Sequence, residues 1–279
     1  MPFSIPLADD QEQLTYGQYL NLRQLISLQH PRSEPPHHDE SLFIIIHQVY
    51  ELWFKQLLHE VSAIIQHLNE DETLVAHRML KRCLEIERLL INQVNVLETL
   101  SPMDFLAFRD LLRPASGFQS YQFRELELLS GLKDHRYLKN YDPGTDEYAR
   151  LEARLGQPSL CDAFYDTLRR RGFDLPADPD EIEGRDAASH QRIGELTRIY
   201  EDANCHYDLF LLAESLIEYD EMFSLWRLRH IQMAERVIGS KTGTGGSEGV
   251  PYLKRTLDRR FFPELWEVRD HLGTDKDGN

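Results

Sequence analysis

The fold of this chain is decided at residues 206–249, which read HYDLFLLAESLIEYDEMFSLWRLRHIQMAERVIGSKTGTGGSEG. Apolar side chains recur there at steps of three and four residues, at Leu216, Ile217, Phe223, Trp226, Met233, Ala234 and Val237. This spacing predicts one long amphipathic helix. Gly239 is a suitable end for the helix, because glycine adopts the left-handed conformation of many helix ends without steric cost.

His230 lies on the same apolar stripe, one turn from Trp226 and from Ala234. A histidine on an apolar face is most often a core residue that bonds a backbone carbonyl. The glycine-rich stretch 239–249 that follows favours a second interpretation, since clustered glycines let the backbone approach a ligand closely. A neutral imidazole that projects from a rigid helix into an apolar slot is also what an axial heme ligand requires. The residues alone leave both interpretations open.

Helical periodicity extends over most of the chain, and alternating strand patterns with hairpin turns are absent from the sequence. Beyond the long helix, we expect helices over residues 15–29, 40–69, 73–99, 101–112 and from Ser116 or Ser120 to 132. Asp39 is expected to cap the helix over 40–69, whose inner stripe is predicted as Ile45, Val49, Leu52, Trp53, Leu57 and Ile64. Residues 136–186 have weaker periodicity and more turn sequences, among them Asp178-Pro179, and are interpreted as a peripheral insertion of short helices. An aromatic-rich segment, 259–272, precedes the polar tail 273–279, and the whole chain, 1–279, is expected to form one all-α domain.

Composition excludes several classes of partner. The 279 residues carry a formal net charge of −16, which disfavours nucleic acid and anionic membrane surfaces. The longest uninterrupted apolar run, 42–46, is far too short to span a membrane. Three widely spaced cysteines suggest neither a disulfide framework nor a zinc site. The N-terminus lacks the basic start and apolar stretch of a secretory signal, so a cytoplasmic location is expected.

Two further side chains are candidates for chemistry. His47 follows Phe43 by one helical turn, so both lie on one face, and His47 is either a core histidine or a site residue. Arg109 projects from a mostly apolar turn, where it is either a salt-bridged scaffold residue or a fork for a carboxylate. The glycine-rich stretch lacks the Gly-Lys-Ser/Thr order of a phosphate-binding loop, which leaves the Thr244 and Ser247 hydroxyls as possible ligand contacts.

Four blocks of the sequence together resemble the tryptophan 2,3-dioxygenase family. They are LTYGQYL at 14–20, HHDE at 37–40 with FIIIHQVYELW at 43–53, PASGFQS at 114–120, and residues 230–249. Each block alone is weak, but the combination is specific and extends over nearly the whole chain. The resemblance implies a heme-dependent dioxygenase that cleaves the indole C2–C3 bond of L-tryptophan with O2. The product would be N-formyl-L-kynurenine, in the first step of tryptophan catabolism by the kynurenine pathway.

The family's architecture is a single all-α domain with a heme pocket between long helices. The resemblance implies one heme b per subunit and a homotetramer, a dimer of dimers. Residues 1–30 would close the pocket of a neighbouring subunit, and residues 239–249 would form a mobile loop over the active site.

Matched position by position, His230 corresponds to the axial ligand of the heme iron and His47 to the histidine that faces the indole N–H. Arg109 would bind the substrate carboxylate, and Thr244 would contact the amino acid end of the substrate. The remaining positions that match substrate-site residues are Phe43 and Phe105 as pocket walls, Ser116 and Gly117 over the oxygen-binding side, and Tyr16 and Tyr19 from the adjacent subunit. The chain departs from some relatives at Phe105, where they have tyrosine, and at Val94, where they have an aromatic residue. These departures bear on fine substrate preference.

Other classes of protein remain as alternatives. A related heme oxygenase of specialised metabolism, acting on an indole or a modified tryptophan, would share the four blocks. A non-catalytic heme or tryptophan sensor would share them too, and a purely structural helical bundle would need none of the chemistry. The mass of the product distinguishes a dioxygenase, which adds two oxygen atoms, from an oxygenase that adds one. Turnover with tryptophan under air distinguishes an enzyme from a non-catalytic sensor.

Overall fold

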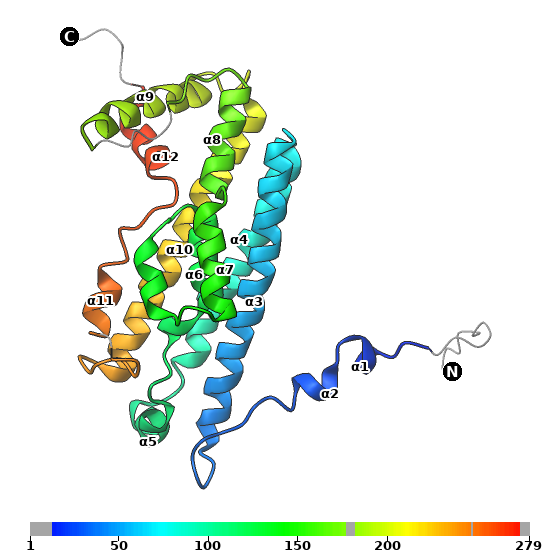
Figure 1. Cartoon of the computed structure of the whole chain (residues 1–279), viewed down its shortest axis with the longest axis vertical. Coiled ribbons are helices and arrows are strands. Elements are labelled where there is room, and N and C mark those ends of the chain that lie inside the picture. The colour runs from blue at the N-terminus through cyan, green and yellow to red at the C-terminus, as the bar shows by residue number, and fades with distance from the viewer. Residues whose placement is uncertain (1–12, 177–181, 247, 274–279) are drawn as a thin grey trace.

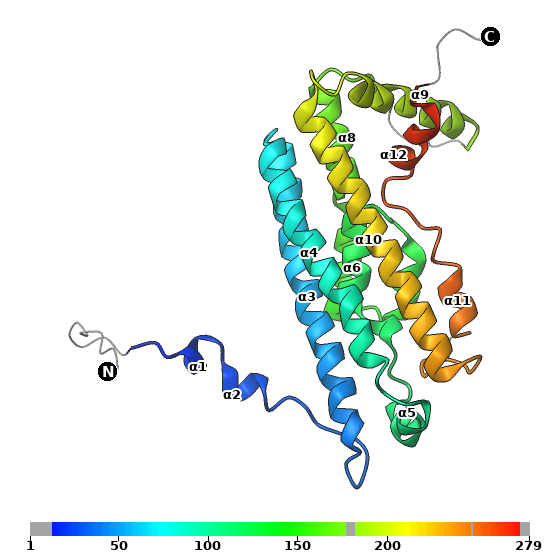
Figure 2. The ribbon, with the colours of Figure 1, turned by 180° about the vertical axis from the view of Figure 1, so that it is seen from behind.

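The core of the fold is three long helices that lie side by side. The computed structural model describes residues 13–176, 182–246 and 248–273, and in these ranges all regular structure is helical. Helix α4 (Thr73–Leu97) packs between α3 (His38–Asn69) and α10 (Tyr207–Ile238), as Figures 1 and 2 show from opposite sides. The expected all-α, single-domain class is therefore confirmed. None of the described helices is both long and apolar enough to cross a bilayer.

Shorter helices complete the bundle. Helices α6 (Tyr121–Ser130) and α8 (Leu160–Arg170) pack against α3, and α7 (Asp146–Gly156) packs against α6. One end of the bundle carries α9 (Ile182–Glu201) and α12 (Pro263–Glu267), and the other end carries α5 (Pro102–Arg109) and α11 (Val250–Lys254), as Figure 1 shows. The 3-10 turns are η1 (Asp110–Leu112), η2 (Gly117–Gln119), η3 (His135–Asn140) and η4 (Val268–His271).

The N-terminal segment does not form the single helix expected over 15–29. It contains two short helices, α1 (Tyr16–Tyr19) and α2 (Leu22–Leu25). Asn21 separates them with a φ of 48°, a left-handed conformation that interrupts a right-handed helix. Both helices project away from the bundle in Figures 1 and 2, so the segment contributes nothing to the core of its own chain.

The predicted inner stripe of α3 is rotated relative to the observed one. Ile45 and Leu52 are 44% and 51% exposed. Leu57 and Ile64 are fully buried as predicted, and Trp53 packs on the core. The other side chains that α3 buries were not in the predicted stripe and are Ile46, Tyr50, Phe54, Leu58, Val61 and Leu68. Five apolar residues in succession, 42–46, fit two neighbouring phases of a helix equally well, so the tertiary neighbours decide which phase is buried.

The helix ends follow local chemistry closely, with one correction. Ser101 and Ser120 cap α5 and α6 as expected, since each hydroxyl accepts a backbone N–H of the first turn. Gly239 ends α10 with a φ of 60°. The cap of α3 is His37 rather than Asp39, and its ring nitrogen accepts the Asp39 N–H at 3.3 Å.

The stretch 136–186 is not entirely peripheral. Leu160, Phe164 and Leu168 of α8 are fully buried in the main core. Helix α9 was not predicted, although Ile193, Leu196 and Ile199 are buried there, because the surrounding sequence has only weak amphipathicity. The Asp178-Pro179 turn and residues 274–279 of the polar tail lie outside the described residues.

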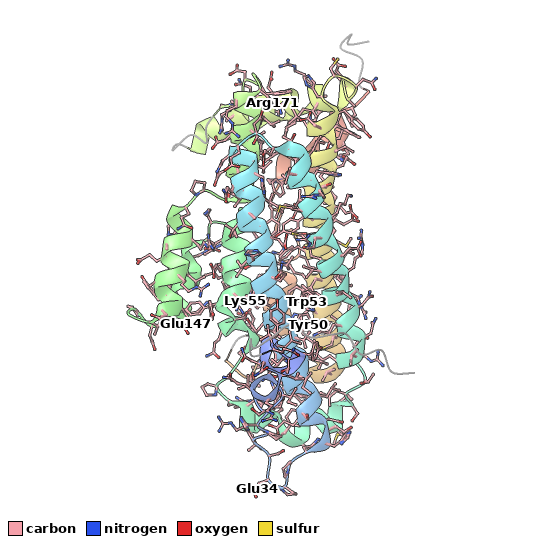
Figure 3. The ribbon with its side chains drawn as sticks, turned by 90° about the vertical axis from the view of Figure 1, so that its right-hand side faces the viewer. Glu34, Tyr50, Trp53, Lys55, Glu147 and Arg171 are labelled. Atoms are coloured by element: carbon pink, nitrogen blue, oxygen red, sulfur yellow. The ribbon has the colours of Figure 1, made fainter. Side chains whose placement is uncertain are left out.

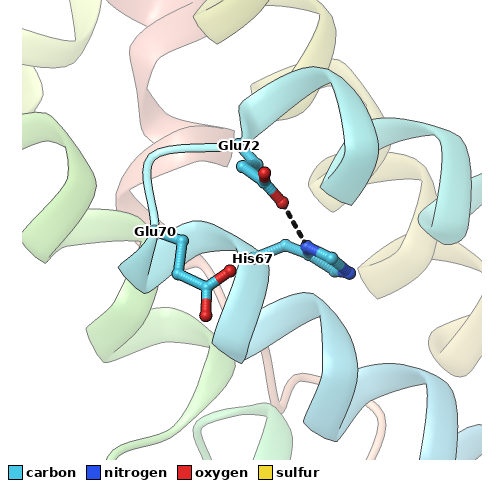
Figure 4. Close-up of side chains that lie close together, drawn as sticks. All are labelled: His67, Glu70 and Glu72. Atoms are coloured by element: carbon cyan, nitrogen blue, oxygen red, sulfur yellow. Dashed lines mark hydrogen bonds and ion pairs between the residues drawn. The ribbon is translucent and has the colours of Figure 1, made fainter.

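A polar cluster closes the turn between α3 and α4. His67 Nδ1 lies 2.6 Å from Glu72 Oε2, and Glu70 lies beside them, as Figure 4 shows. Asp71 takes a φ of 63° in this turn and pairs with Arg171 at 2.8 Å. All of these carboxylates are exposed, and the hydrogen bond already uses the ring nitrogen of His67 that faces Glu72. We therefore interpret the cluster as a solvated turn rather than a metal centre.

A buried carboxylate of α10 binds the segment 259–272 near the C-terminus. Asp220 is fully buried and accepts the backbone N–H groups of Phe261 and Phe262 at 3.1–3.3 Å. It also accepts the indole N–H of Trp266 at 3.0 Å. One side chain of the central helix thus satisfies three donors of a segment that has little regular structure of its own.

We predict that Asp220→Ala lowers the free energy of unfolding by about 2–4 kcal/mol. The reason is that it leaves buried donors unpaired, and hydrogen bonds to charged groups contribute roughly 1.5–3 kcal/mol. Urea unfolding followed by circular dichroism measures the change. Glu221→Ala is the control, because the neighbouring Glu221 is exposed, and it should change the free energy of unfolding little. Equal stability of the two variants would show that Asp220 does not hold the segment.

Candidate active site

A cavity of about 260 Å3 lies between the N-terminal half of α3 and the C-terminal part of α10. The segments that follow α5 and α10 complete its lining. Its lining is mostly apolar and includes Phe54, Phe123, Trp226, Ile231 and Leu253. The site residues predicted from the sequence that line it are His47, Phe105, Arg109, Ser116, Gly117, His230 and Thr244. An apolar cavity with a few convergent polar groups is typical of a small-molecule site.

His230 reaches the cavity from α10, one turn beyond Trp226. Burial, together with a smaller contribution from the nearby His47, lowers the pKa of His230 to about 4. Within the described part of the chain, neither ring nitrogen of His230 has a hydrogen-bond partner. His230 is therefore a neutral imidazole whose ring nitrogens are available to bind a metal ion.

His47 lines the same cavity from α3. Its Nδ1 lies 2.7 Å from the carbonyl oxygen of Phe43, one turn earlier. Burial lowers the pKa of His47, while the Phe43 carbonyl and the Glu51 carboxylate oppose the shift. Because a carbonyl only accepts, Nδ1 must carry the proton in the neutral ring, and Nε2 is left as an acceptor. The arrangement suits a ligand that brings an N–H or O–H donor into the cavity.

Arg109 supplies a buried cation at the α5 end of the cavity, where 5% of its surface is exposed. Its guanidinium donates a hydrogen bond to the backbone carbonyl of Thr242 in the glycine-rich loop. The acidic group that faces it is Asp110, 4.0 Å away and itself 80% exposed. A guanidinium held by a carbonyl and a distant, solvated carboxylate retains the charge and the N–H donors to bind an anion.

The glycine-rich loop closes over the segment 114–117. Thr244 Oγ1 donates to the carbonyl of Ala115 at 2.6 Å. A Cβ atom at Gly245 would lie 2.7 Å from Cβ of Ser116, closer than any real pair of such atoms, so this approach requires glycine. The backbone of the loop at Gly245 therefore packs directly on Ser116. Ser247 lies outside the described residues.

Three predicted residues do not line the cavity of this chain. Phe43 lies behind His47, with ring centroids 4.2 Å apart, and stacks on Phe105 at 5.4 Å. It supports the wall rather than forming its surface. Tyr16 and Tyr19 of α1 are 74% and 72% exposed, away from the bundle.

Several cavity residues were not identified from the sequence. Tyr50 and Phe54 follow His47 at three and seven residues on the same helical face, a spacing that would have indicated them. A buried charge cluster also lies in the wall, where Glu127 accepts from Arg124 at 2.5 Å and from Arg227 at 3.0 Å. These two arginines come from different helices, so sequence spacing could not bring them together.

Comparison with known proteins agrees with this geometry. The family model described as tryptophan 2,3-dioxygenase matches residues 6–171 and 184–272. A curated protein named tryptophan 2,3-dioxygenase from Nocardioides sp. is 49% identical over 265 residues, covering 93% of this chain and 95% of the relative. Proteins of the same name from Myxococcus xanthus and Bacillus cereus are 44% and 43% identical and cover 92% and 95% of this chain, and 89% and 95% of their own lengths.

The resemblance seen in the four sequence blocks is thus confirmed over almost the whole length. The ranges that the family model matches include the three long helices and the loops that line the cavity. The chain belongs to the tryptophan 2,3-dioxygenase family.

Proposed function

We propose that this protein is a heme-dependent tryptophan 2,3-dioxygenase, which opens the indole ring of L-tryptophan with O2 and yields N-formyl-L-kynurenine. That reaction is the first step of tryptophan catabolism by the kynurenine pathway. The observation that carries the proposal is that His230, His47 and Arg109, from three different helices, line one apolar cavity. The family assignment supplies the reaction, and the cavity supplies a role for each residue.

The residues of the cavity fit a heme b, one per chain, and His230 would hold its iron. The fit rests on the neutral imidazole, its unpaired ring nitrogens and the aromatic and aliphatic side chains around it. When bound, the heme supplies the activation of O2, which no side chain can perform alone. The protein contributes the axial ligand, the orientation of the substrate and a dry cavity.

The polar groups of the cavity match the two ends of tryptophan. Arg109 would pair with the substrate carboxylate, because an unpaired charge in an apolar site costs several kcal/mol. Thr244 in the adjoining loop would contact the amino acid end. His47 Nε2 would accept the indole N–H, and Phe105 would lie along the ring. His47 thus positions the indole by one hydrogen bond and is not required to act as a base.

The segments 114–117 and 239–249 would cover the bound substrate. Ser116 and Gly117 would lie over the oxygen-binding side, and the glycine-rich loop would move to admit tryptophan. The contacts between Thr244 and Ala115 and between Arg109 and Thr242 support this role, since they join the loop to the carboxylate-binding residue. A closed loop excludes water from the reaction.

We further propose a homotetramer, a dimer of dimers, in which residues 1–30 of one subunit close the pocket of its neighbour. The exposed tyrosines of α1 and the projection of α1 and α2 from the bundle support this exchange. Ile45 and Leu52 on the outer face of α3 are apolar and half-exposed, as expected of a surface that a second subunit covers.

The function is tested by mass identification of the product. Reduced, heme-loaded protein receives L-tryptophan and then 18O2, and a dioxygenase adds two labelled oxygen atoms to the substrate. A single added oxygen would identify a monooxygenase instead, and heme binding without turnover would identify a sensor. The control is His230→Ala, which should fold but lack both heme and activity.

We predict that Arg109→Ala weakens tryptophan binding by about two orders of magnitude or more. The substitution removes a desolvated, charge-assisted pair that contributes roughly 2–4 kcal/mol. Titration of the heme spectrum with tryptophan measures the affinity, and the spectrum without substrate should be unchanged. Arg109→Lys should restore binding only in part, because an ammonium cannot reproduce the planar fork. Unchanged affinity in the alanine variant would make Arg109 a scaffold residue.

His47→Ala should reduce turnover without abolishing it. It removes one hydrogen bond between neutral groups, which contributes about 1 kcal/mol. The lowered pKa of His47 keeps the ring neutral, so in the wild type the acceptor should be lost only at a pH below the usual histidine range. Steady-state kinetics against pH check both expectations. Complete loss of turnover with normal tryptophan binding would show that His47 is an obligatory base.

The exchange of N-terminal segments predicts complementation between two inactive variants. Tyr16→Ala with Tyr19→Ala should lower activity much more than heme content, because these rings close the pocket and do not hold the iron. Tetramers that mix this double variant with Arg109→Ala subunits should regain activity. Some of their pockets combine an intact Arg109 with intact tyrosines from the neighbour. Recovery would be absent if each subunit completed its own site.

A further inference from the structure

No hydrogen bond among the described residues fixes the plane of the His230 ring, so another contact must fix it. Rotation about the bond between Cβ and an imidazole ring has only a broad energy minimum, so the plane of the ring is soft unless something holds it. A histidine that binds a metal usually donates its second N–H to a carboxylate or a carbonyl, which fixes the plane. His230 has no such acceptor among the described residues.

The indole face of Trp226 takes the place of that hydrogen-bond acceptor. Trp226 lies one helical turn before His230, and the two ring planes are parallel to within 4°, with centroids 5.3 Å apart. At this angle and distance the rings are offset and stacked, an arrangement that aromatic pairs favour. Rotation of the imidazole away from this plane would drive its edge toward the indole.

Trp226 can fix the plane of the His230 ring because contacts from other helices fix its own position. Phe123 of α6 contacts it at a centroid distance of 4.9 Å. Tyr50 and Phe54 of α3 meet it edge-on at 6.2 and 6.4 Å. Tyr50 is fixed in turn, because its hydroxyl donates to the carbonyl of Leu90 on α4 at 2.9 Å. Three helices other than α10 thus determine the position of the indole.

We propose that Trp226 is the positioning residue for the axial ligand: its indole face, clamped by α3 and α6, sets the plane of the His230 imidazole in place of a hydrogen-bond acceptor. The inference rests on the proposed heme function and deepens it. An acceptor on the second ring nitrogen makes an imidazole a stronger electron donor to a metal. With stacking in its place, His230 stays a neutral imidazole, a weaker donor, which favours the ferrous state over the ferric state.

The test compares Trp226→Leu, which removes the flat face, with Trp226→Phe, which keeps a smaller one. The control is Trp53→Leu, the same substitution at a half-buried tryptophan in the middle of α3, near Tyr50 (Figure 3). Trp53 packs on the core but does not line the cavity. In the ferrous heme protein, the rate of heme loss and the iron–imidazole stretching band are measured. In cofactor-free protein, nuclear relaxation of the His230 ring reports its motion.

Trp226→Leu should lose heme roughly 10–100-fold faster, as substitutions behind a metal ligand typically do. Its iron–imidazole band should broaden and shift, and the His230 ring should be more mobile without heme. Trp226→Phe should lie between this variant and the wild type, and Trp53→Leu should match the wild type. The inference is overturned if Trp226→Leu retains the wild-type band, rate and ring motion, or if Trp53→Leu changes all three equally.

Failure of the proposed function would give a different result. A wild-type protein that binds no heme would refute the function, whereas the ring motion of cofactor-free protein would still report whether Trp226 holds His230. Should Trp226→Leu fail to fold, Trp226→Phe decides the question, since a lost stack would then appear as faster heme loss in a folded protein.

Discussion

The packing of α10 against α4 is the constraint on which the rest of the structure depends. Helix α10 buries Leu212, Leu216 and Phe223 along one side, and this fixes both its position and its rotation. The same rotation points Trp226 and His230 into the cavity. The end of the helix at Gly239 then sets where the glycine-rich loop begins, close to the segment that it covers.

The site combines an apolar wall with a few polar groups, and three of these groups have a specific hydrogen-bond partner. His47 is held by a carbonyl of its own helix, Arg109 by a carbonyl of the loop, and Thr244 by a carbonyl of the segment it covers. The pKa values of His47 and His230 are both lowered, which favours the neutral form of each ring. The groups are therefore oriented before any ligand arrives, which reduces the cost of binding.

Much of the fold could be predicted because it depends on local spacing. The extent of α4 and α10, the serine caps of α5 and α6 and the helix end at Gly239 all follow from side chains within one or two turns. The rotation of α3 and the existence of α9 could not be predicted in this way. A continuous apolar run fits more than one helical phase, and a weakly amphipathic segment becomes a helix only when its neighbours bury it.

The sequence by itself determined that this is a helical protein, where its long helices end, and, through four blocks of residues, to which family it belongs. Only the tertiary structure decided that His47, Arg109 and His230 line one cavity, that Trp226 lies parallel to His230, and that Arg124 and Arg227 share Glu127. The physical reason is that helix formation and capping act over three or four residues. Which helix lies beside which depends on how all the apolar faces are buried together, and no single segment carries that information.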